Sequence, residues 1–141
     1  MKETKYIPGD LVMFKNPFEP SDTCVGIVKF LGNISDIILL CPYTNLNLEY
    51  FIKVENIQGI PITPEILEKN GWKRTQIFID DDGFEFHTYI DDERCLDLEY
   101  YPQYKKFAAF ICKQEVLSDI EYVHQLQHLL FGLGINHEME V

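Results

Sequence analysis

Two histidines at helical spacing are the residues with the clearest potential for chemistry. His124 and His128 lie four residues apart, and Glu121 lies three residues before His124. On a helix these side chains share one face, where two imidazoles can bind one metal ion and a carboxylate can act as third ligand or base. The metalloprotease motif needs a glutamate directly after the first histidine, but Gln125 stands there. We therefore keep His124 and His128 as candidate metal ligands and expect a solvated polar face without a metal.

A connection rich in tyrosine and lysine is the candidate binding surface. It combines large, rigid aromatic area with hydrogen-bonding tips, a composition enriched at protein interfaces. The alternative is that Tyr100 and one other ring complete the core while the lysines cover a sheet edge. The candidate binding residues are Tyr100, Tyr101, Tyr104, Lys105 and Lys106.

Other motifs that carry chemistry are missing from the sequence. The acidic turns 80–82 and 91–93 would lie roughly 25 Å apart at opposite ends of one strand, too far to share a carboxylate site. Neither turn has the ligand spacing of a calcium loop, so we expect both to be solvated. The sequence has no G-x-S-x-G motif, no cysteine with a catalytic signature and no glycine-rich phosphate loop. We therefore expect no enzyme activity, no catalytic residue and no cofactor.

Residues 1–58 have the pattern of a small barrel. Short apolar runs are separated by glycine, proline and asparagine turns, which predicts a strongly bent antiparallel sheet. The expected strands are 11–14, 25–30, 34–41 and 50–57. The segments Gly9-Asp-Leu-Val12 and Val25-Gly-Ile-Val28 resemble the start of SH3-like barrels.

Residues 59–141 predict a second part, which makes the whole chain α+β. A short helix is expected at 64–70, since Thr63 can cap its start, Pro64 suits its first turn and Gly71 can end it. Trp72 is expected to hold this helix against the sheet. A four-stranded antiparallel meander is expected over 75–112, packed under a final helix at 119–133, and residues 137–141 could add an edge strand.

The final helix has its own start signal and an unusually wide apolar face. Ser118 and Glu121 form the sequence of a capping box. The apolar side chains from Ile120 to Leu133 fill an arc of about 200°, which is wider than packing on one sheet requires. We therefore expect something besides the meander to cover this helix.

Composition narrows the choice of partners. The 141-residue chain has 46% hydrophobic and 13% aromatic residues, enough for a folded core. Its net charge is −11, with six Lys/Arg against nine Asp/Glu in residues 1–70 and six against fourteen in residues 71–141. Such a surface repels nucleic acid and anionic lipid unless a basic patch overrides it. We expect a protein partner or a second copy, and neither nucleic acid nor a membrane.

Cysteine use and apolar runs bear on location. No apolar run reaches the ~20 residues that cross a bilayer, and the N-terminus leads into no apolar signal segment. The four cysteines are isolated, and Cys41 and Cys112 each follow an apolar run. We expect buried, reduced thiols and a cytoplasmic protein.

Two longer segments resemble a known group of proteins. Pro61–Arg74 (PITPEILEKNGWKR) and Tyr122–Phe131 (YVHQLQHLLF) look like segments of short uncharacterised proteins from anaerobic gut bacteria and their prophages and phages. The resemblance covers chiefly residues 57–141. It implies a cytoplasmic or infected-cell setting and mobile-element biology, and it supplies no functional residues.

These observations favour a non-enzymatic protein that binds another protein. The resemblance adds a phage setting, in which the target would be a host or defence protein. One alternative is a structural homodimer in which the apolar face of the final helix packs on its symmetry mate. Another is nucleic-acid binding through the SH3-like barrel, which the net charge of residues 1–70 does not favour. An enzyme acting through His87, His124 or His128 is the last.

Overall fold

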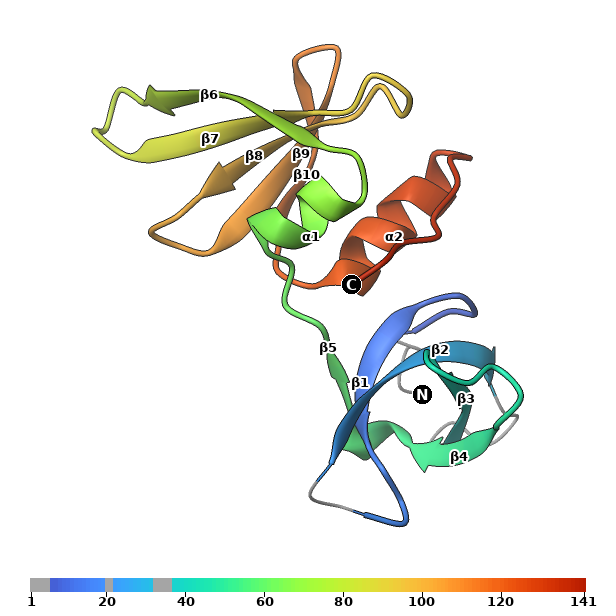
Figure 1. The fold of residues 1–141 in the computed structure, drawn as a ribbon. Helices are drawn as coiled ribbons and strands as arrows, with labels where there is room; N and C mark the ends of the chain where they lie inside the picture. The colour runs from blue at the N-terminus through green and yellow to red at the C-terminus, as the bar shows by residue number, and fades with distance from the viewer. Residues whose placement is uncertain (1–5, 20–21, 32–36) are drawn as a thin grey trace, which may run out of the picture. The chain divides into compact units, whose positions relative to one another are not determined.

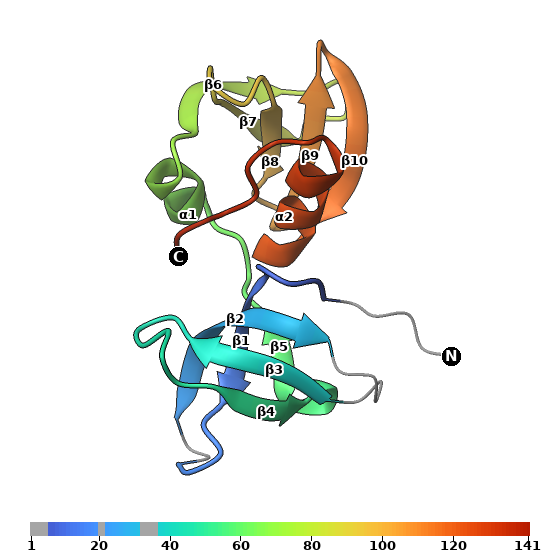
Figure 2. The same ribbon diagram turned by 90° about the vertical axis from the view of Figure 1, so that its right-hand side faces the viewer.

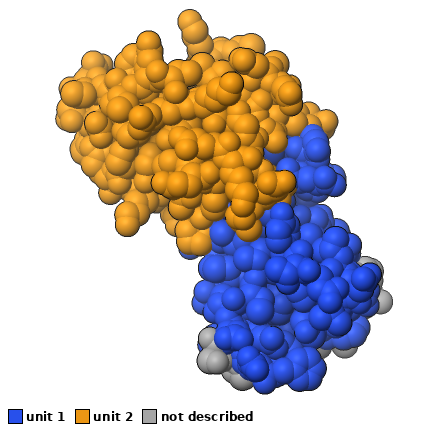
Figure 3. Space-filling view, in the orientation of Figure 1, with its two compact units in different colours: residues 1–60, 122–132, 136–138 blue, residues 61–121, 133–135, 139–141 orange. Residues whose placement is uncertain are grey.

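The computed structural model describes residues 6–19, 22–31 and 37–141. The chain forms two compact units (Figure 3). The first comprises residues 1–60, 122–132 and 136–138, and the second comprises residues 61–121, 133–135 and 139–141. Each unit contains one five-stranded antiparallel sheet, and α-helices complete an α+β fold.

The first sheet is a strongly bent meander whose last strand pairs with its first strand. Its strands are β1 (Leu11–Lys15), β2 (Thr23–Leu31), β3 (Ile37–Pro42), β4 (Tyr50–Lys53) and β5 (Ile57–Gly59), in the order β4-β3-β2-β1-β5 (Figure 2). The single strand expected at 50–57 is wrong, because one turn of 3-10 helix, η1 (Val54–Asn56), divides it. β4 pairs with β3 and β5 pairs with β1, so the chain passes from one edge strand to the other at η1 without changing direction. The turn expected at residues 32–33 lies outside the described residues.

The core of this unit forms inside the bend of the sheet. It consists of Tyr6, Val12, Phe14, Val28, Leu40, Ile52 and Ile57. Leu11, which points to the opposite face of β1 from Val12, is buried as well. β1 is therefore covered on both of its faces.

The C-terminal helix, α2 (Val123–Gly132), is shorter than expected and belongs to the first unit. The expected start at 119 is wrong, because Ser118 lies in a strand and cannot cap the helix. The Gln125 side chain instead accepts a hydrogen bond of 2.9 Å from the Tyr122 N–H. Among the strands, α2 packs mainly on β1. This differs from the expectation that residues 59–141 form a unit of their own with the helix over the meander.

A substitution at Gly59 in β5 tests how α2 packs in this unit. A Cβ atom on Gly59 would lie 2.7 Å from ring atoms of Tyr122 and 2.9 Å from the His124 ring. We expect Gly59→Ala to lower the free energy of unfolding by about 1–3 kcal/mol, because the buried His124 ring and the half-buried Tyr122 ring would have to move. Gly132→Ala is the control, since its Cβ meets nothing within 4 Å. Urea denaturation measures both, and equal stability of the two variants would contradict this packing.

The second sheet is a simple meander of five strands. They are β6 (Lys73–Ile79), β7 (Glu85–Ile90), β8 (Asp97–Tyr101), β9 (Lys106–Ile111) and β10 (Gln114–Ile120), paired in chain order (Figure 1). The expected meander at 75–112 thus gains a strand, β10, from residues that the sequence pattern had assigned partly to the helix. Residues 137–141 form no strand. β6 and β10 are the two edges.

The two faces of this sheet differ in what covers them. Tyr89, Leu98 and Ala109 pair across β7, β8 and β9 and are buried on the face that we call the inner face. The opposite, outer face carries Phe86 and Tyr101, which are only half-buried. Polar and aromatic side chains, among them Glu99 and Tyr101 in β8, share the outer face.

A short helix and the tryptophan close the second unit as expected. In α1 (Pro64–Lys69), the Thr63 hydroxyl caps the Ile66 N–H at 3.2 Å. Trp72 is 1% exposed, and its Nε1 donates a hydrogen bond of 3.0 Å to the Leu96 carbonyl. The Arg94 guanidinium lies 4.4 Å from the centre of the tryptophan ring.

Neither α1 nor α2, the α-helices of the described residues, has the length and apolar character needed to cross a bilayer.

The acidic turn after β7 is a structural element and is not simply solvated. Asp91 is buried, and its carboxylate accepts hydrogen bonds from the Glu93 and Arg94 N–H groups. It also pairs with the Arg94 guanidinium, which donates to the Asn70 carbonyl at the end of α1. The turn therefore fixes the arginine that lies over Trp72.

Candidate binding surfaces

The structure divides the predicted tyrosine surface between two faces of the second sheet. Tyr100 and Tyr101 are neighbours in β8, so their side chains point to opposite faces. Tyr100 stacks on Phe107 with ring centres 4.5 Å apart, on the inner face. Tyr101 stacks on Phe86 at 5.5 Å, on the outer face. Tyr100 thus contributes to the core, and Tyr101 does not.

The other three predicted residues lie at the turn between β8 and β9. Tyr104 is exposed and contacts Phe84, with ring centres 5.7 Å apart. Lys105 is exposed at a left-handed backbone position, with φ of 53°. Lys106 is half-buried and pairs with Glu121 at 3.3 Å. The five residues therefore do not form one continuous surface.

A row of three aromatic rings crosses the outer face. Phe78 in β6 stacks on Phe86 in β7 with ring centres 5.3 Å apart, and Phe86 stacks on Tyr101 in β8. Phe78 stands directly opposite Phe86 in the sheet register. Phe78 remains 42% exposed at the end of the row. We call these three residues the aromatic row.

Carboxylates surround the tyrosine end of this row. The Tyr101 hydroxyl donates a hydrogen bond of 3.4 Å to Glu99. Burial raises the pKa of Glu99, the hydrogen bond from Tyr101 lowers it, and the nearby charge of Glu115 raises it further. Burial also raises the pKa of Tyr101, and the negative charges of Glu99, Asp80 and Glu115 add to this shift. The outer face is therefore both apolar and acidic.

Sequence reasoning found Tyr101 but not its two partners. Simple alternation along β7 places Phe86 on the face opposite Tyr89, and this signal is visible in the sequence. The position of Phe78 is not, because a register shift lies between Arg74 and Gln76 in β6. A shift of this kind changes the face on which every later side chain lies.

The two histidines of α2 occupy a buried polar cluster in the first unit. His124 is 2% exposed, and its ring lies 5.0 Å from the Tyr6 ring, centre to centre. His128 Nε2 lies 2.7 Å from Oδ2 of Asp10, a carboxylate that is completely buried. The expectation that both histidines face water is therefore wrong. Helix α2 packs on β1 with this face.

Gln127 connects the same cluster to two backbone segments, residues 9–11 and His137. Its Oε1 accepts a hydrogen bond of 2.9 Å from the Leu11 N–H. Its Nε2 donates to the carbonyls of Gly9 and His137 at 3.1 and 3.0 Å. These hydrogen bonds hold the helix to the backbone of the unit. Among the described residues, no three His, Cys, Asp or Glu side chains lie close enough together to hold a metal ion. His124 and His128 contribute to the packing of the helix through their contacts with Tyr6 and Asp10.

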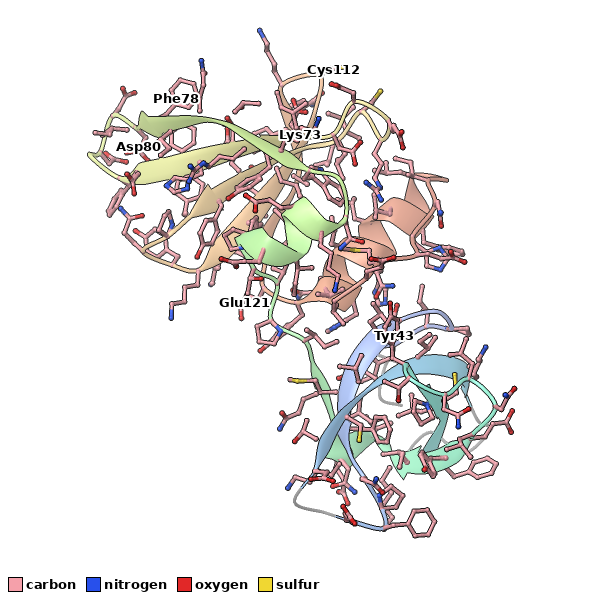
Figure 4. All side chains as sticks on the ribbon, viewed as in Figure 1. Tyr43, Lys73, Phe78, Asp80, Cys112 and Glu121 are labelled. Atoms are coloured by element: carbon pink, nitrogen blue, oxygen red, sulfur yellow. The ribbon has the colours of Figure 1, made fainter. Side chains whose placement is uncertain are left out.

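The cysteines fall into two classes. Cys41 is buried and Cys24 half-buried, whereas Cys95 and Cys112 are exposed. The expectation of a buried Cys112 is wrong, because this residue begins the turn between β9 and β10 (Figure 4). None of the four is in a disulfide.

A shallow cleft lies in the first unit beside β1, with a volume of about 80 Å³. Its lining residues are Met13, Phe14, Lys15, Thr23, Glu55, Asn56 and Gln58. One lysine and one glutamate leave the lining without net charge. The cleft is smaller than the roughly 300–1,000 Å³ of typical ligand pockets.

Comparison with known proteins adds no assignment to this geometry. No known protein family matches the chain, and neither does any curated protein or solved structure.

Proposed function

We propose that the chain is a non-enzymatic protein-binding module that uses the outer face of its second sheet. The observation that carries this proposal is the aromatic row on a face that the sheet's own core does not use, with Phe78 exposed and Phe86 and Tyr101 half-buried. Aromatic residues at the centre of a contact supply much of the binding energy in protein interfaces.

The chemistry of the face favours a protein with basic side chains. The rings of the row stack on one another, so both flat sides of Phe86 and one flat side each of Phe78 and Tyr101 are already occupied, which disfavours stacking on nucleic-acid bases. They present a continuous apolar strip instead. Glu99, Glu115 and Asp80 border this strip, and the net charge of −8 over residues 71–141 attracts a positive partner.

The test is a pull-down from the lysate of a gut bacterium, in which the natural chain and chains substituted in the outer face serve as bait. We expect a partner that binds the natural chain in a stoichiometric amount and is lost with Phe78→Ala and with Tyr101→Ser. Removing one central aromatic residue should weaken binding by tenfold or more, since such residues cost roughly 2 kcal/mol or more. Phe51→Ala is the matched control, because Phe51 is 76% exposed in the first unit. Retention of the partner by both variants of the face would refute the proposal.

We propose that the first unit is an SH3-like barrel that serves as a scaffold. The support is the pairing of the fifth strand, β5, with the first strand, β1, and the single turn of 3-10 helix between β4 and β5. The described cleft of this unit, beside β1, is neutral and therefore does not favour nucleic-acid binding there. The cytoplasmic, mobile-element setting of the protein rests on the resemblance of residues 57–141 to phage and prophage proteins.

A further inference from the structure

The edge strand β6 is exposed along its whole length. It pairs with β7 on one side, and no other strand of the described residues pairs with it. All seven of its side chains are exposed, including Ile77 at 51% and Ile79 at 75%. A long, apolar edge strand with unpaired N–H and C=O groups is a template for pairing with another chain.

The opposite edge of the sheet is protected in the ways that natural proteins use. β10 has two register shifts against β9, and it carries Glu115 and Asp119 within the strand. Bulges and charges of this kind prevent pairing at an edge. β6 has one shift, near its start, and the five residues from Thr75 to Ile79 carry no charge. The difference between the edges indicates that β6 has an occupant.

The charges at the two ends of β6 identify that occupant. Lys73 and Arg74 begin the strand, and the turn Asp80–Asp82 follows it. Lys73 lies at one end and Phe78 and Asp80 at the other (Figure 4). In an antiparallel pair of identical strands, the positive end of one strand lies beside the negative end of the other. The sequence KRTQIFIDDD is therefore complementary to itself in this orientation.

We propose that two copies of the chain pair through β6 in an antiparallel, two-fold symmetric arrangement. Ile77 lies opposite its own copy at the symmetry axis. Arg74 then lies opposite Asp80, and Lys73 lies beside Asp81, which stands in the turn that follows β6. The two meanders join into one continuous sheet across the dimer, and the exposed apolar side chains Ile77 and Ile79 become covered. A symmetric interface of this type uses the same surface of both subunits and closes at two copies.

A second copy fits this edge better than a different protein. Any basic partner would meet repulsion from Lys73 and Arg74, and any acidic partner would meet it from Asp80 and Asp81. Only a strand with both charges in this order matches both ends. The inference does not depend on the aromatic row, because the row lies on a face of the sheet and β6 pairs through its edge.

The first measurement is the mass of the full chain in solution by light scattering and by sedimentation. A dimer has twice the chain mass of 16.6 kDa. We expect a dimer for the natural chain and for Phe51→Lys, a control at an exposed position of the first unit. We expect Ile77→Lys to be monomeric, because two lysines would meet at the symmetry axis. Ile77 is half-exposed, so this variant should fold, and its circular dichroism spectrum should match that of the natural chain.

A charge exchange tests the register. Lys73→Glu alone and Asp81→Lys alone each place like charges opposite one another twice in the dimer, and each should weaken dimerisation by about tenfold. A mixture of the two variants restores both pairs in the heterodimer. Native mass spectrometry should show the heterodimer in excess over the statistical proportion. Asp80 is left unchanged, because its carboxylate accepts hydrogen bonds within the turn.

Three results would overturn the proposal. A monomeric natural chain at high micromolar concentration would show that β6 does not pair with a copy. A dimer that persists in Ile77→Lys would place the interface elsewhere. A statistical mixture of the charge variants would exclude this register. Each result is independent of partner capture by the aromatic row.

Discussion

Replacing Trp72 by alanine should lower the free energy of unfolding by about 3–5 kcal/mol, the largest effect expected from any single substitution in this chain. The side chain is 1% exposed, so alanine would leave a cavity in the core of the second unit. The substitution also removes the donor to the Leu96 carbonyl and the ring beneath Arg94. A loss of this size is a large part of the roughly 5–15 kcal/mol that stabilises a typical domain.

The measurement is urea denaturation followed by far-ultraviolet circular dichroism. Tryptophan fluorescence cannot be used, because Trp72 is the only tryptophan in the chain. Trp72→Phe is the matched control: it keeps much of the buried apolar volume and loses the N–H group, so it should cost about 1–2 kcal/mol. If alanine and phenylalanine cost the same, the contribution of Trp72 comes from its hydrogen bond and not from packing.

Local signals predicted the elements that local interactions build. Thr63, Pro64 and Gly71 mark the ends of α1, and each acts at the backbone position where it stands: the hydroxyl caps, the proline fixes the first turn, and the glycine adopts φ of 100°. Alternation along β7 is a local signal of the same kind, and it places Phe86 and Tyr89 on opposite faces. These features need only the residues within one turn or strand.

Elements that depend on distant pairing were not predictable in the same way. Ser118 and Glu121 have the spacing of a capping box, yet β10 continues to Ile120 because Ile120 pairs with Phe107 in β9. A ladder to a neighbouring strand outweighs a single cap worth about 1 kcal/mol. The aromatic row needs three strands in register, and the shift after Arg74 cannot be seen in the sequence. Pairing across strands, not local propensity, therefore decides the candidate surface.

Asp10→Ala should lower the free energy of unfolding by about 2–4 kcal/mol, whereas Asp10→Asn should raise it slightly at neutral pH. The Asp10 carboxylate is buried and accepts a hydrogen bond of 2.9 Å from the Ile7 N–H, and it lies 2.7 Å from His128 Nε2. Alanine leaves both groups without their partner, and each unsatisfied group costs about 1–3 kcal/mol. Asparagine keeps an acceptor for Ile7 and removes the buried negative charge.

The direction in which the pKa of Asp10 is shifted determines whether Asp10→Asn raises or lowers the free energy of unfolding. Burial raises this pKa above the usual value of 3.8, and the opposing contributions of Ile7, His128 and His137 do not cancel the shift. Because the folded chain holds the proton more tightly than the unfolded chain, protonation of Asp10 stabilises the fold, and this stability is lost as the pH rises through the folded pKa. The stability of Asp10→Asn relative to the natural chain should therefore increase from pH 3.8 upwards and level off above the raised pKa. Urea denaturation at a series of pH values measures this difference, and subtracting the natural chain cancels the titration of other groups.

His128 provides the test of this assignment. The charge and hydrogen bond of His128 lower the pKa of Asp10, so they reduce the cost of the buried carboxylate. In a His128→Gln background, the advantage of Asp10→Asn should become larger, and the two substitutions should not be additive because their side chains are in contact. Additive effects would mean that Asp10 and His128 do not interact in solution. A falling advantage with rising pH would mean that the carboxylate is stabilised in its ionised form, and that α2 is held on β1 by an ion pair and not by the apolar residues around it.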